Sequence, residues 1–89
     1  MSKVYLALQD NDMSRYIVQA VEEDNPEVTV TYQPAMIRME CEDKLVVNRA
    51  TVEEKLGREW DIQELQLSLV TLGGNVEEEE EALTLSWQK

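Results

Sequence analysis

The sequence contains no histidine, no phenylalanine and only one cysteine, Cys41, among its 89 residues. The absence of histidine removes the commonest general acid–base, the Ser–His and Cys–His pairs and the usual zinc ligand. It also removes the Glu-x-x-His pattern of carboxylate-bridged diiron sites. One cysteine can form neither an intrachain disulfide nor a four-thiolate iron–sulfur site. The sequence therefore predicts no catalytic centre, no metal site and no bound cofactor.

Long apolar runs and Gly-rich phosphate loops are absent as well. No apolar stretch approaches the roughly 20 residues that a membrane-spanning helix needs. Residues 1–10 lack the apolar core and the cleavage site of a secretory signal. Neither standard spacing of a phosphate-binding loop occurs, and Gly73-Gly74 alone is more often a turn. We therefore expect a cytoplasmic protein without a membrane partner.

Acidic residues outnumber basic residues by 19 to 8, which gives a formal net charge of -11. Nucleic acids and anionic membranes are poor partners for such a chain, because binding their phosphates needs a basic face. The charge mainly favours solubility, and it also accelerates encounter with a basic patch on a protein partner.

Hydrophobic residues make up 43% of the chain and are spread along its whole length, which predicts one ordered domain over residues 1–89. Alternating apolar positions predict strands at 3–9, 28–32, 36–41, 44–48, 67–72 and 82–87. The three strands between residues 28 and 48 are expected to form an antiparallel meander. The glutamate run Glu77–Glu81 is expected to be a solvated loop or strand end.

One longer helix is expected between the first two strands. Residues 10–12 offer its N-cap, and it should end near Asp24 because Pro26 disfavours a helical conformation at the residue before it. Its apolar stripe, at helical spacing, consists of Met13, Tyr16, Ile17, Ala20 and Val21.

Two short helices are expected in the second half of the chain. Thr51 with Glu54 has the form of a capping box, and Gly57 is placed to stop the helix that they open. Asp61 with Glu64 has the same form. The predicted fold class is therefore α+β: one small domain of antiparallel sheet with one longer helix and two short helices.

Three other kinds of protein fit parts of this pattern. A hydrolase that uses carboxylates alone needs only two Asp or Glu residues, although so small a domain leaves little room for a cleft. An acidic carrier protein would need a serine for its prosthetic arm, and Ser14 lies near a helix start. The third kind is an electron carrier, which a colourless visible spectrum would exclude. Cys41, in an alternating strand, is expected to be a buried hydrophobe and not a nucleophile.

Five segments, taken in order, resemble the effector proteins of bacterial multicomponent phenol hydroxylases. They are residues 11–18 (NDMSRYIV), 34–38 (PAMIR), 51–54 (TVEE), 65–75 (LQLSLVTLGGN) and 83–87 (LTLSW). The resemblance covers nearly the whole chain and extends more loosely to the coupling proteins of toluene and methane monooxygenases. It implies a cofactor-free regulatory subunit that binds a diiron hydroxylase and tunes its active site, its activation of dioxygen and its coupling of NADH oxidation to product. An NADH-dependent reductase supplies the electrons in such systems.

The docking residues are a separate hypothesis. Arg and Met are enriched at interface cores, and here they stand within the recognisable segments. The candidate partner-binding residues are Asn11, Asp12, Met13, Arg15, Met36, Arg38, Gly73, Gly74 and Asn75. Met13 and Met36 are equally compatible with a core position, and Asp12 with a helix cap.

Overall fold

The structure, a computed structural model, describes residues 3–87 and folds them into two antiparallel sheets with helices packed against them. The elements in chain order are β1 (Lys3–Gln9), α1 (Asp12–Asp24), β2 (Thr29–Gln33), β3 (Met36–Glu42), β4 (Lys44–Asn48), α2 (Arg49–Leu56), the 3-10 helix η1 (Ile62–Leu67), β5 (Leu69–Gly73), β6 (Asn75–Glu78) and β7 (Ala82–Ser86). The α+β class is confirmed.

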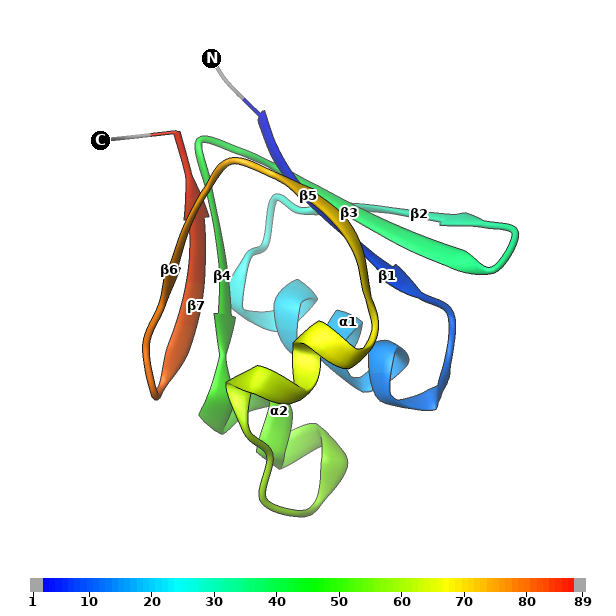
Figure 1. Cartoon of the computed structure of the whole chain (residues 1–89), viewed down its shortest axis with the longest axis vertical. Coiled ribbons are helices and arrows are strands. Elements are labelled where there is room, and N and C mark those ends of the chain that lie inside the picture. Colours follow the sequence, from blue (N-terminus) through cyan, green and yellow to red (C-terminus); the bar gives the residue numbers. More distant parts are fainter. Residues whose placement is uncertain (1–2, 88–89) are drawn as a thin grey trace.

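Sheet A has the strand order β2-β3-β1-β5, and sheet B has the order β4-β7-β6. Both helices and η1 lie on one side of sheet A, below it in Figure 1, and no described element covers its opposite face. The chain just after β7 is joined to the start of β1, because the Trp87 indole N–H donates to the Lys3 carbonyl at 2.8 Å. Sheet A therefore has one face in the core and one open face.

The core lies between the inner face of sheet A, the helices and sheet B. Alternate residues of β1 and β3 point inward, as their pattern predicts, because successive strand side chains face opposite sides. These inward residues, all buried, are Val4, Leu6, Leu8, Ile37, Met39 and Cys41. Leu45 and Val47 of β4, Leu83 and Leu85 of β7, and Trp60 complete the same cluster.

The predicted meander over residues 28–48 is wrong in its third strand. β2 and β3 pair as expected, but β4 leaves sheet A and pairs with β7. Asp43, between β3 and β4, has φ 65°, and Gly74, between β5 and β6, has φ 133°. Each residue turns the chain from sheet A into sheet B. Alternation of apolar and polar residues identifies a strand but not the strand with which it pairs. Strand β6, which was not predicted, follows the turn at Gly74.

Helix α1 begins and ends where the sequence predicts. The Asn11 side chain caps it by accepting the Ser14 N–H at 2.9 Å. Its buried face is rotated from the predicted stripe, since Ser14 and Val18 are buried while Tyr16 is 38% exposed. Hydrophobicity alone predicted the wrong edge of the buried face. The side chain of Ser14 is small enough to be buried against neighbouring elements, whereas the larger side chain of Tyr16 is not.

The two short helices differ in how they begin. The predicted capping box of Thr51 and Glu54 is wrong: α2 starts earlier, at Arg49, with no side-chain cap bond from Asn48. Its stop at Gly57, with φ 78°, is confirmed. The Asp61–Glu64 capping box of η1 is confirmed in both of its hydrogen bonds.

Glu53 ties the end of α2 to the chain that follows it. Its carboxylate accepts the Trp60 backbone N–H at 2.9 Å and the Arg49 Nε–H at 3.3 Å. The hydrogen bond from Trp60, followed by the one from Arg49, lowers the pKa of the Glu53 carboxyl. The glutamate thus helps to hold Trp60 in the core.

Asn25 joins the end of α1 to sheet B. Its side-chain amide donates to the carbonyls of Val21 and Val46, at 2.9 and 2.8 Å, and its Oδ1 accepts the Val46 N–H at 3.0 Å. The asparagine thus takes the place of a neighbouring strand for one residue of β4, and it is itself only 8% exposed.

We predict that Asn25→Ala lowers the free energy of unfolding by about 2–3 kcal/mol, because it leaves shielded backbone groups of Val46 without partners. Urea unfolding measures this. The matched control is Asn48→Ala, which removes a single side-chain bond to Asp24 and should cost about 1 kcal/mol or less. Equal costs for the two variants would contradict the bridging role.

Candidate docking surface

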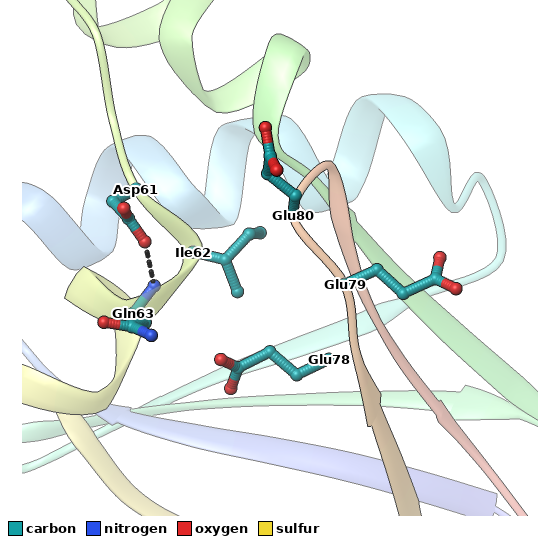
Figure 2. Close-up of a pocket in the computed structure, with 6 residues that line it drawn as sticks. All are labelled: Asp61, Ile62, Gln63, Glu78, Glu79 and Glu80. Carbon is teal, nitrogen blue, oxygen red and sulfur yellow. Dashed lines mark hydrogen bonds between the residues drawn. The ribbon is translucent and has the colours of Figure 1, made fainter.

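A group of carboxylates around one surface hollow does not form a catalytic pair. A surface hollow of about 250 Å³ is lined by Asp61, Ile62, Gln63, Glu78, Glu79 and Glu80. Asp61 is occupied in accepting the Gln63 N–H at 2.9 Å. Figure 2 shows Glu79 pointing away from Glu78, and Glu80 turning toward another side of the hollow. Two carboxylates facing one bond, as glycoside hydrolysis requires, are not assembled here.

The two other residues considered for a chemical role, Cys41 and Ser14, are buried. Cys41 is a buried free thiol, and burial raises its pKa, so little of it is the reactive thiolate. Ser14 is fully buried, which leaves no access for a prosthetic arm.

Across residues 3–87, no group of three or more His, Cys, Asp or Glu side chains is arranged to hold a metal ion. No helix in the same range is long and apolar enough to cross a membrane.

The start of α1 is held in place by its neighbours. Arg15 donates from Nε to Asp10 at 2.9 Å and from Nη2 to the other Asp10 oxygen at 3.3 Å. The hydrogen bond with Asp10 raises the pKa of Arg15. The Asp10 N–H donates to the carbonyl of Ala35. Ala35 lies in the turn between β2 and β3 and has φ 64°. The helix start and this turn therefore form one end of the molecule, with Arg15 on its surface.

Met36 and Arg38 extend this end onto the open face of sheet A. In the β1–β3 register Met36 lies opposite Gln9, and Arg38 lies opposite Ala7. The Arg38 guanidinium carbon is 4.1 Å from the centroid of the Tyr5 ring, and its Nη2 is 3.4 Å from Glu40. Stacking on an aromatic ring orients the guanidinium while leaving donors at its edge.

Gly73 is required by the same stack. It lies directly opposite Tyr5 in the β1–β5 register. A Cβ atom on Gly73 would lie 2.1 Å from Cε2 of the Tyr5 ring. The glycine thus lets the ring lie flat over β5 and beneath Arg38, so its contribution to the surface is indirect.

The structure divides the nine candidate residues. Asn11, Asp12, Arg15 and Met36 lie at the end of β1 that leads into α1, whereas Gly74 packs beside Val4 near the start of β1. Arg38 lies between these two ends, opposite Ala7 and over the Tyr5 ring. These ends are about 17 Å apart along the strand. Asn75 is the first residue of β6, in sheet B, and Met13 packs against the core. The helix start and the Gly74-Asn75 corner are therefore not neighbours.

Charge is distributed very unevenly over the molecule. Of the 19 acidic residues, only Glu40 and Glu42 lie in the four strands of sheet A. The exposed apolar side chains on or beside this sheet are Tyr32 (62%), Leu67 (81%) and Val70 (48%). Sequence reasoning missed these residues and Tyr5. The uncharged stretches around them carried a signal, but the candidate residues were selected by other features, Arg and Met side chains and the Gly73-Gly74-Asn75 turn.

An α+β domain whose open sheet face is poor in charge, and whose Arg and Tyr side chains are held by neighbours, has a surface suited to binding another protein. The sequence matches the MmoB/DmpM family over residues 2–86, and the chain belongs to that family.

Individual relatives agree with this. The chain is 51% identical over 87 residues to the stimulatory component DmpM of phenol 2-monooxygenase from Pseudomonas sp. (strain CF600), covering 98% of this chain and 97% of that one. It superposes with a TM-score of 0.93, at 48% identity, on a chain from a structure of a phenol hydroxylase–regulatory protein complex, covering 98% and 100%. The regulatory protein B of soluble methane monooxygenase has the same fold, with a TM-score of 0.76 at 17% identity over 97% of this chain and 65% of that one.

We predict that Gly73→Ala lowers the free energy of unfolding by about 1–3 kcal/mol, because the new methyl group displaces the Tyr5 ring. In a Tyr5→Ala background the same substitution should cost much less. Urea unfolding of the two single variants and the double variant measures the coupling. Strictly additive costs would contradict the stack of Gly73, Tyr5 and Arg38.

Proposed function

We propose that this protein is the regulatory component of a multicomponent phenol hydroxylase and is not itself an enzyme. It binds the diiron hydroxylase component and adjusts its active site, its activation of dioxygen and its coupling of NADH oxidation to hydroxylation. The observation that carries this proposal is the full-length likeness, at 48% identity, to a chain from a phenol hydroxylase–regulatory protein complex. The 51% identical relative, the stimulatory component of a phenol 2-monooxygenase, supports the same proposal.

The physical basis of such regulation is differential binding. A cofactor-free protein changes a hydroxylase only by binding one of its conformations more tightly than another, and such coupling is typically about 1–3 kcal/mol. This chain supplies a rigid surface for the purpose. A standard interface takes about 800 Å² per partner, and the described chain has 5368 Å² of accessible surface.

The residues proposed to dock are those at the α1 end of sheet A. Arg15 and Arg38 are each oriented by a neighbour, Asp10 and Tyr5 respectively. Such preorganisation reduces the entropy lost on binding. Asn11, Asp12 and Met36 lie around them, Gly73 supports Tyr5, and Met13, Gly74 and Asn75 are assigned supporting positions away from this centre.

The proposed unit is the whole domain of residues 1–89, working in the cytoplasm beside an NADH-dependent reductase. A reducing compartment suits a chain whose single cysteine is free and buried. A carrier protein is the rival binding module, and the complete burial of Ser14 argues against it.

Phenol turnover by purified hydroxylase and reductase, titrated with this protein, tests the function. Product formation per NADH should rise and then saturate. Arg15→Ala combined with Arg38→Ala should raise the half-saturating concentration about tenfold, as expected when two interface arginines are lost. Unchanged turnover with folded wild-type protein would overturn the regulatory role.

The matched control is Arg58→Ala. Its side chain is 52% exposed, against 60% for Arg15, and it likewise pairs with a carboxylate, here Glu64. It lies after α2, away from the open face of sheet A. It should leave half-saturation unchanged, and an effect equal to that of the double variant would contradict the assignment of the docking residues.

A further inference from the structure

Two apolar side chains are held in solvent beside the proposed docking residues. Leu67, the last residue of η1, is 81% exposed, although Leu65, two residues earlier in the same helix, is 1% exposed. Val70, in β5, is 48% exposed. A single exposed leucine is ordinary, but two exposed apolar side chains three residues apart form the beginning of a patch.

The backbone that carries them is fixed. Ser68, between them, is only 4% exposed. Its carbonyl accepts the Gln9 N–H at 2.7 Å, and its hydroxyl accepts a hydrogen bond from the Asn11 side chain at 3.1 Å. Leu67 and Val70 are thus tied to the end of β1 and to the cap of α1, and they are continuous with the docking surface that contains Asn11.

A bulge directs Val70 outward. The β1–β5 register shifts between Ala7 and Leu8, where Leu69 pairs with Leu8 and Thr71 with Ala7. Val70 is the additional residue of β5 at this point. Bulges commonly redirect a side chain at functional positions, and here the result is a valine on the surface and not in the core.

The surrounding strand lacks the charged side chains usual at an exposed edge. β5 is an edge strand of sheet A, and edge strands normally carry charges that prevent association. Residues 65–76 include no Asp, Glu, Lys or Arg, although 30% of the chain is charged. The edge strands of sheet B differ, because β4 carries Lys44, and β6 carries Glu77 and Glu78.

We propose that Leu67 and Val70 are apolar anchors that insert into an uncharged, apolar depression on the hydroxylase component. This inference rests on the proposed function and adds a site to it. The distribution of charge indicates which part of the hydroxylase meets this edge. A basic patch on the hydroxylase would be attracted to the glutamates of sheet B. The uncharged edge formed by β5 instead suits a hydroxylase surface that is itself uncharged. The anchors and the two arginines then form one continuous interface along the end of β1.

Equilibrium binding to immobilised hydroxylase tests the anchors separately from turnover. The double variant Leu67→Gln and Val70→Thr removes apolar contact with little change in size. Because both positions are exposed, thermal unfolding should be nearly unchanged. The dissociation constant should rise about tenfold or more, as for interface anchors. Val76→Thr, at a valine that is 42% exposed in β6, is the matched control and should bind like wild type.

A folded double variant with wild-type affinity overturns the proposal, as does an equal loss in Val76→Thr. Sedimentation of the free protein supplies a further outcome: self-association that the double variant abolishes, with hydroxylase affinity unchanged, would assign the anchors to a second copy and overturn the proposal. Wild-type protein that binds but does not alter turnover would refute the regulatory function alone, and the affinities would still decide the role of the anchors.

Discussion

The pairing of β1 is the constraint on which the rest of the structure depends. This strand is hydrogen-bonded to β3 along its full length and to β5 on its other edge. Val4, Leu6 and Leu8 fill the core beneath it, while Tyr5 and Ala7 alternate onto the other side of the sheet, where Ala7 is itself fully buried. The end of β1 continues into the residues that cap α1, and the Gln9 N–H donates a hydrogen bond to the Ser68 carbonyl. A shift of β1 by one residue would exchange these faces and dismantle both the core and the docking surface together.

Function follows from how charge and rigidity are divided between the two sheets. The acidic residues are concentrated away from the strands of sheet A, so the molecule keeps its solubility while one face remains nearly free of carboxylates. The two arginines proposed to dock are each held by a neighbour: Arg15, at the start of α1, by Asp10, and Arg38, on the open face of sheet A, by the Tyr5 ring. Such a surface loses little conformational freedom on binding, which suits a protein that acts only through the state it stabilises in its partner.

Local patterns predicted the elements well and their partners poorly. The α1 cap, the Gly57 stop, the η1 capping box and the inward residues of β3 all follow from neighbouring residues alone. The positive-φ turn at Asp43 and the bulge that exposes Val70 depend on contacts distant in sequence, so the pairing of β4 with β7 and the apolar anchors were not foreseen. Periodicity likewise placed Leu67 at the start of the predicted strand 67–72, whereas it is the last residue of the 3-10 helix and is turned outward. Of the candidate site, Arg15 and Arg38 were found by residue type, but the separation of Arg15 from Gly74 required the strand register.

Amide hydrogen exchange of the protein, free and bound to the diiron hydroxylase of a phenol hydroxylase, shows directly which surface docks. We expect slower exchange in the bound protein for residues 10–16 and 65–71, which flank the end of β1. Exchange at the glutamate run, residues 77–81, should be unchanged. Protection confined to the glutamate run and sheet B, with none at 10–16 or 65–71, would contradict docking through the open face of sheet A.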